Sequence, residues 1–284
     1  MTESLTSIEF PDSLVRIGNY AFSPYSNGYG GSYIEYTTSN LENIKFGSGI
    51  KTIGKQAFYK NEKLKSIDLT GSNLTLIDTG AFQNCISLIE INLSGNNLVI
   101  ESSAFYDDKY LKNVTFGAGI KSIGSNAFYN CLSISELNFF DGLDRIYSDA
   151  FRNCKSISLV TLPNTLSSIG NSAFYNCERI TSVHIPDKVT EIQGGCFTNC
   201  HLLKKVTIGS GCTSISPTAF TGANSIEEII VEEDNKKYTS VDGVLYNNDK
   251  TTLVLYPKGR RGNFTIPDAV TTIAERAFER CNNI

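Results

Sequence analysis

The sequence predicts a β-solenoid, in which short coils of the chain stack on one another along one axis. Three observations predict this fold: the pair Ala-Phe recurs along the chain, the step between pairs is 23 residues over a long stretch, and each unit contains a short run of alternating apolar residues. A unit of this length has no second face on which to bury its apolar side. Neighbouring units must therefore cover one another.

The repeat is read most directly from its Ala-Phe pair, which begins at residues 21, 57, 81, 104, 127, 150, 173, 219 and 277. Cys196-Phe197 fills the one missing place, so the step stays at 23 residues from Ala81 to Ala219. The unit reads L-x-x-I-x-I-P-x-x-V-x-x-I-G-x-x-A-F-x-x-C. About ten coils are expected from a chain of this length.

Each part of the unit has a physical role. The L-x-x-I-x-I segment alternates with a period of two residues, which indicates a short strand with one apolar face. A proline such as Pro186 ends that strand, because it has no backbone N–H for a ladder. The V-x-x-I-G segment is expected to turn the chain, with glycine at a positive φ. Ala-Phe then sends a large ring inward beside a small residue.

The pattern resembles the BspA-like leucine-rich repeats. Two units also approach the more common leucine-rich signature L-x-x-I-x-L-x-x-N-x-L: one contains Leu88, Ile91, Leu93, Asn96 and Leu98, and the other has Ser72 in the asparagine place. The resemblance implies a solenoid with a parallel sheet on the concave face and short turns with irregular or 3-10 segments on the convex face. It also implies a cell-surface or secreted protein that acts in adhesion.

The chain is expected to form a single leucine-rich-repeat solenoid over residues 1–284, interrupted by two insertions. Residues 23–40 are rich in Gly, Ser and Tyr and predict a protruding loop. This loop is either a tolerated surface insertion or a binding loop that presents Tyr25, Tyr29, Tyr33 and Tyr36.

The second insertion, residues 232–262, predicts a β-hairpin. Its two alternating runs, Val241 to Tyr246 and Thr251 to Tyr256, flank the sequence Asn-Asn-Asp-Lys. Leu5 opens a unit with no capping element before it, and Ile284 is the first residue of a unit that does not continue. Because terminal repeats usually need a cap, we expect the chain to be a segment of a longer protein.

Composition limits the range of partners. The formal net charge is -4 and no basic stripe is present, which argues against nucleic acid as a partner. No apolar run approaches the length of a membrane span, so direct membrane insertion of this segment is not expected. The first ten residues lack the basic and apolar regions of a signal peptide.

The cysteines predict packing and no chemistry. Cys85, Cys131, Cys154, Cys177, Cys200 and Cys281 share one place in the unit, while Cys196 and Cys212 take the Ala and Val places. Residues tied to core places are expected to be buried free thiols. The segment Cys-Phe-Thr-Asn-Cys-His offers Cys196, Cys200 and His201, but a metal site needs exposed thiolates. No nucleophile, base and stabiliser come together, so the prediction is a protein without catalytic residues, metal or cofactor.

The outward places of the strands are the candidate partner-binding face, for a protein or glycan ligand. They are Glu90, Asn92, Asn113, Thr115, Glu136, Asn138, Thr161, Ser182, His184, Lys205, Thr207 and Glu228. The alternatives are a merely solvated sheet surface and a structural stalk that spaces another domain. A Tyr row after the core Phe (Tyr59, Tyr106, Tyr129 and Tyr175) predicts either a contact strip or packing between coils, and the adjacent Asn row is expected to satisfy backbone groups of the turns.

Overall fold

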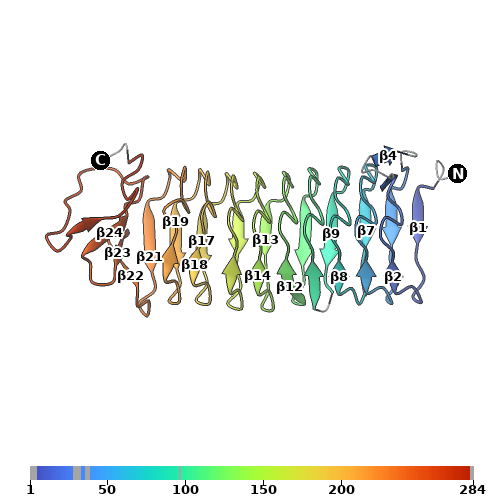
Figure 1. The fold of residues 1–284 in the computed structure, drawn as a ribbon, viewed down its shortest axis with the longest axis horizontal. Helices are drawn as coiled ribbons and strands as arrows, with labels where there is room; N and C mark the ends of the chain where they lie inside the picture. Colours follow the sequence, from blue (N-terminus) through green and yellow to red (C-terminus); the bar gives the residue numbers. More distant parts are fainter. Residues whose placement is uncertain (1–4, 28–32, 36–38, 96, 282–284) are drawn as a thin grey trace.

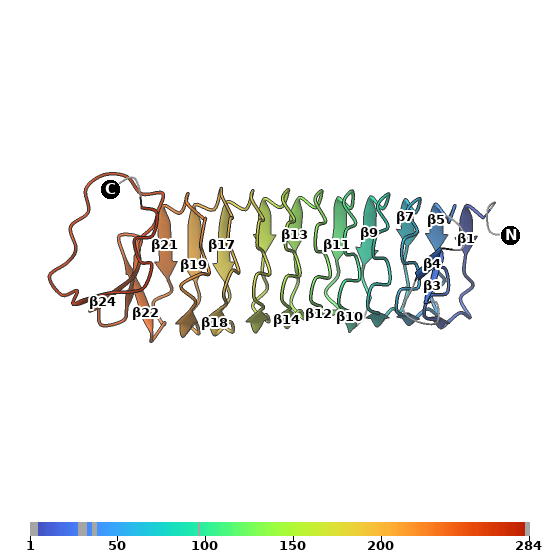
Figure 2. The same ribbon diagram turned by 45° about the horizontal axis from the view of Figure 1, so that its top comes forward.

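The computed structural model describes residues 5–27, 33–35, 39–95 and 97–281. These residues form an elongated stack of β-coils whose first and last coils lie at opposite ends of the rod (Figures 1 and 2). No helix of any type occurs in these ranges. The solenoid predicted from the 23-residue period is therefore confirmed.

One row of parallel strands runs along the rod and comes from the L-x-x-I-x-I segments. Glu90 pairs with Asn113 and Ser182 with Lys205, so the register between coils is one repeat. The row divides into three hydrogen-bonded sheets, ordered β1-β5-β7-β9-β11, β13-β15 and β17-β19-β21. The strands are β1 (Ser7–Glu9), β5 (Asn43–Lys45), β7 (Ser66–Asp68), β9 (Glu90–Leu93), β11 (Asn113–Phe116), β13 (Glu136–Asn138), β15 (Leu159–Thr161), β17 (Ser182–Ile185), β19 (Lys205–Ile208) and β21 (Glu228–Val231).

A second row of parallel strands corrects the expectation that V-x-x-I-G only turns the chain. Each of these segments carries two to four paired residues, too few for an alternation to be visible in the sequence. Seven strands form one sheet and β18-β20 form another. They are β2 (Arg16–Ile17), β6 (Thr52–Ile53), β8 (Leu76–Ile77), β10 (Leu98–Ile100), β12 (Ile120–Ile123), β14 (Arg145–Ile146), β16 (Ser168–Ile169), β18 (Glu191–Ile192) and β20 (Ser214–Ile215).

The rod is nearly straight in both views, so its two strand rows are not a concave and a convex side (Figures 1 and 2). We call the surface formed by the outward side chains of the first row the strand face. The expected 3-10 segments are likewise absent from the described residues, where consecutive turns close each coil.

The turn side depends on two left-handed residues in most coils, one before Ala-Phe and one two residues after Phe. Asn126 and Asn130 have φ values of 57° and 59°, and Ser172 and Asn176 have 56° and 60°. Each of these residues donates its backbone N–H to a carbonyl of the following coil. Asparagine is frequent there because it tolerates this conformation better than most residues.

The glycine after the second-row isoleucine has a different role from the one expected. Gly124 and Gly170 are absent from the residues with positive φ. A Cβ at Gly170 would instead lie 2.4 Å from the backbone nitrogen of Ser148 in the preceding coil, and one at Gly124 would lie 2.6 Å from the backbone of Glu101. Glycine is required because the coils approach so closely.

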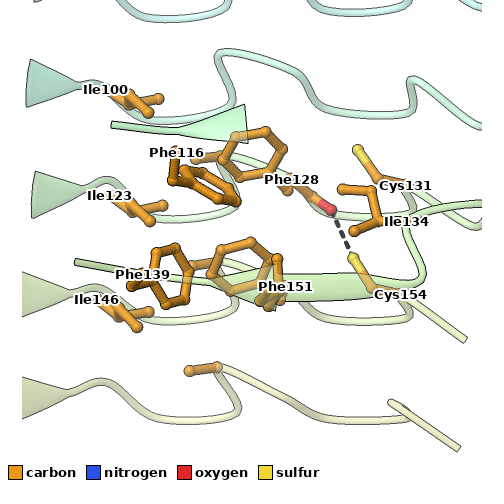
Figure 3. Close-up of a cluster of buried hydrophobic side chains, with 14 of the residues drawn as sticks. Ile100, Phe116, Ile123, Phe128, Cys131, Ile134, Phe139, Ile146, Phe151 and Cys154 are labelled. Atoms are coloured by element: carbon orange, nitrogen blue, oxygen red, sulfur yellow. Dashed lines mark hydrogen bonds between the residues drawn. The ribbon is translucent and has the colours of Figure 1, made fainter. Parts of the chain in front are cut away.

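The core is a column of phenylalanine rings along the rod axis. From Phe22 to Phe220 successive rings lie 5.0–5.8 Å apart and within 9° of parallel. Figure 3 shows two of these rings, Phe128 and Phe151, with the first-row rings Phe116 and Phe139 on the side toward the second-row isoleucines and the cysteines on the other side. Each coil is thus buried mainly by its two neighbours.

The insertion near the C-terminus contains a coil that the sequence does not reveal. β22 (Tyr238–Val241) and β23 (Val244–Asn247) pair antiparallel around Asp242 and Gly243, so the run expected from Val241 to Tyr246 is divided by a turn and its strand begins at Val244. β24 (Thr252–Leu255) pairs antiparallel with β23 and parallel with β25 (Thr272–Ile273). Tyr256 then stacks on Phe278 at 5.1 Å and takes the place of a column ring.

The first insertion contains a short antiparallel pair, β3 (Tyr25–Asn27) and β4 (Tyr33–Glu35), in which Tyr33 lies opposite Asn27. Of the candidate loop tyrosines, Tyr25 and Tyr33 belong to these strands. Tyr29 and Tyr36 lie outside the described residues.

The ring column predicts a gradient of stability along the rod. Phe151→Ala removes a fully buried ring with a neighbour on each side, and it should lower the free energy of unfolding by about 3–5 kcal/mol. Phe278→Ala should cost clearly less, because Phe278 is only partly buried. Urea unfolding of both variants measures the difference, and equal penalties would contradict a stacked column.

Candidate functional site

The strand face presents all the predicted partner-binding residues on one surface. Eleven of the twelve side chains are exposed and Thr207 is half-buried. Glu90 and Asn92 lie opposite Asn113 and Thr115, and Asn138 lies opposite Thr161. The fold therefore brings these residues into two parallel lines.

Carboxylates at the two ends of the strand face are neutralised by lysines of the adjacent coil. Nζ of Lys45 lies 2.6 Å from Oε1 of Glu9, and Nζ of Lys205 lies 3.2 Å from Oε2 of Glu228. Within the described residues, Asp68, Glu90 and Glu136 of the middle strands form no ion pair. The carboxylates in the middle of the face therefore stand outside any ion pair that the structure describes, and Asp68 among them feels the charge of Lys45, which helps to lower its pKa.

A shallow polar recess of about 320 Å³ lies over β7, β9 and β11. Its lining includes Asp68, Glu90, Asn92, Asn113 and Thr115, so four of the predicted residues share it. Two hydrogen bonds from Thr70, one of them from its backbone N–H at 2.9 Å, lower the pKa of Asp68. This carboxylate is consequently ionised at neutral pH.

Sequence reasoning missed an acidic group beside His184. Nε2 of His184 lies 3.1 Å from Oε1 of Glu232, which follows β21. Partial burial, followed by a hydrogen bond with Asp187, raises the pKa of Glu232. Hydrogen bonds from Ser210 lower the pKa of Asp187. Glu232 was not found because it occupies the place directly after the strand, which Pro163, Pro186 and Gly209 fill in the preceding coils, and this place was not counted among the outward ones.

Two exposed hydrophobic side chains were also missed. Leu159 fills an outward place of β15 and is 46% exposed, and Phe140 follows β13 and is 55% exposed. The place of Phe140 is taken by Gly117 and Pro163 in the neighbouring coils. A comparison of equivalent places coil by coil would have identified both, because the other outward residues of the middle strands are polar and the place of Phe140 holds no large apolar residue in the neighbouring coils.

The cysteine place forms a column of buried thiols that bridge adjacent coils. The thiols of Cys131, Cys154 and Cys177 each donate to the carbonyl of the phenylalanine in the preceding coil, at 3.0–3.2 Å. Figure 3 shows the bond from Cys154 to the carbonyl of Phe128. Burial raises the pKa of each of these thiols. All eight cysteines are free, and the fully buried column is protonated and unsuited to nucleophilic or metal chemistry.

Two coils place a different polar residue in this column. Nδ2 of Asn61 donates to the carbonyl of Phe22 at 2.9 Å, so the amide replaces the thiol. Oδ1 of the fully buried Asp108 accepts the backbone N–H of Cys85 at 2.8 Å, while its Oδ2 has no partner. Burial raises the pKa of Asp108 well above its usual range, so the folded chain favours the neutral carboxyl.

The Asn and Tyr rows connect coils to one another. Nδ2 of Asn153 donates to Oδ1 of Asn130 at 2.8 Å, and Nδ2 of Asn176 donates to Oδ1 of Asn153 at 3.0 Å. These asparagine side chains therefore bond to one another, whereas bonds to backbone groups of the turns were expected. The rings of Tyr106 and Tyr129 stack at 4.8 Å, and these rings serve the packing between coils.

Other classes of site find little support in the described part of the chain. It contains no group of three or more His, Cys, Asp or Glu residues arranged to hold a metal ion. Nor does it contain a long apolar helix that could cross a membrane.

The periodic core and the flat polar face are those of a leucine-rich-repeat protein. The profile described as "BspA type Leucine rich repeat region" matches residues 1–28, 31–158, 121–251 and 256–284 in six copies. The chain therefore belongs to the BspA-type leucine-rich repeat family. Repeats of this family are associated with protein binding and recognition and are typically non-catalytic.

Solved structures support the same fold. A leucine-rich repeat protein from Bacteroides ovatus is 18% identical with a TM-score of 0.61, over 95% of this chain and 73% of that one. A leucine-rich cell surface protein from Faecalibacterium prausnitzii is 19% identical with a TM-score of 0.52, over 97% and 80%. A search of curated proteins found no significant match.

Asp108 predicts an unusual pH dependence of stability. Below about pH 4 the carboxyl is protonated in both the folded and the unfolded chain, so it contributes no pH dependence there. As pH rises, the unfolded carboxyl ionises while the buried one resists, so the free energy of unfolding should fall. Asp108→Asn should remove this slope and stabilise the fold at pH 7 by about 1–3 kcal/mol.

Urea unfolding between about pH 4 and 8 measures both effects, with the exposed Asp141→Asn as the matched control. A native slope that persists in Asp108→Asn would show that the buried carboxyl is not its source.

Proposed function

We propose that this protein recognises a partner macromolecule, a protein or glycan, through the strand face, and that it acts in adhesion as a cell-surface or secreted protein. The observation that carries the proposal is the two lines of exposed polar side chains held in register along the rigid rod. Such side chains are preorganised, which reduces the entropic cost of binding. Family membership supports recognition as the general role.

A spacer that holds another domain away from a surface is the second candidate. It is favoured by the straight rod, whose first and last coils lie at opposite ends (Figure 1). A spacer needs length and stiffness but no particular outward residues, so substitutions on the strand face distinguish the two functions.

The test is to block the centre of the strand face. The ligand is the immobilised matrix protein or mucin-type glycan that the native chain binds best. Asn138→Arg with Thr161→Arg places two bulky cations on adjacent strands. This double substitution should weaken binding to that ligand by about tenfold or more. Thr190→Arg, on the exposed entry to the second-row strand β18, is the matched control. Binding that survives the double substitution would exclude this face.

A further inference from the structure

The middle of the strand face differs from its ends in charge. From β7 to β17 the outward places hold Asp68, Glu90 and Glu136, and no lysine or arginine. Lys45 lies opposite Asp68 in register, but its Nζ is 2.6 Å from Glu9. Lys112 stands at the entry to β11, and no ion pair in the described part of the chain joins it to Glu90 or Glu136. The face is thus complementary to positive charge.

Leu159 adds an apolar contact at one end of this acidic stretch. It is the only hydrophobic side chain among the outward places from β7 to β17, and it lies directly opposite Glu136 in register. An exposed apolar side chain surrounded by polar ones is suited to anchor a partner, because its burial excludes water from the neighbouring ion pairs.

We propose, resting on the function proposed above, that the middle of the strand face binds an extended basic segment of a partner protein, with an apolar residue of that segment seated on Leu159. The segment crosses the strands along the rod axis.

The spacing of the face fits such a segment. With about 4.8 Å between strands, Glu90, Glu136 and Leu159 lie roughly 5, 14 and 19 Å along the axis from Asp68. Alternate residues of an extended chain lie on one side and are spaced by roughly 6.6 Å. The cations at the third and fifth residues and an apolar group at the seventh therefore fall close to Glu90, Glu136 and Leu159, which share one line of outward places. Asp68 stands in the other line, about 6.6 Å across, within reach of the long side chain of the first lysine.

The probe is a fluorescent, terminally blocked heptapeptide, Lys-Ser-Lys-Ser-Lys-Ser-Leu, titrated with the native chain at low salt. We expect saturable binding that weakens strongly as salt approaches about 0.5 M. Glu90→Gln and Glu136→Gln should each weaken binding about two- to fivefold, and Leu159→Ser by a comparable factor. Glu191→Gln, an exposed glutamate at β18 on the other strand row, is the matched control and should have no effect.

The outcomes separate this inference from the function on which it rests. If the heptapeptide does not bind, or if Glu191→Gln weakens it as much as Glu90→Gln, the basic-segment proposal is overturned. A second outcome would also overturn the basic-segment proposal. In it, a macromolecular partner no longer binds the variant with Asn138→Arg and Thr161→Arg, but binds the variant with Glu90→Gln and Glu136→Gln as tightly as the native chain. The strand face would then remain the recognition surface. A peptide with glutamate in place of lysine that binds equally well would also contradict the basic-segment proposal.

Discussion

The whole structure depends on equivalent residues of successive coils lying directly above one another. No coil can bury its own phenylalanine, so each ring is covered by the rings of the coils before and after it. The repeat length is constrained for the same reason, since a shift of one residue would move inward side chains to the outside. The backbone ladders of both strand rows reinforce the same register.

Close approach of the coils also explains the polar residues inside. Backbone groups of the turns lie in the core, and each needs a partner from the adjacent coil. A thiol satisfies the phenylalanine carbonyl at little cost because it is small and weakly polar. The Asn61 amide does the same, whereas the buried Asp108 carboxyl accepts the backbone N–H of Cys85 and favours its neutral form. The cysteines are therefore structural, despite their number.

Stacking of the coils depends little on the outward side chains of the middle strands. The side chains of Glu90 and Leu159 contribute little to the fold, yet the ladder holds their backbones rigidly. A surface of this kind can vary in sequence without loss of stability, which suits recognition. The residues in the outward places of the strand face are therefore more informative about a partner than the residues of the repeated core.

From the sequence alone, the period identified the solenoid, the first strand row, the ring column and the outward direction of residues such as Glu90 and His184, because all of these repeat at a fixed spacing. Only the tertiary structure revealed the second strand row, the reason for Gly170, the coil at Tyr256 and the contact of His184 with Glu232. These features arise from contacts between coils or from an insertion. A one-dimensional pattern records which places repeat, but it does not record which atoms of different coils meet.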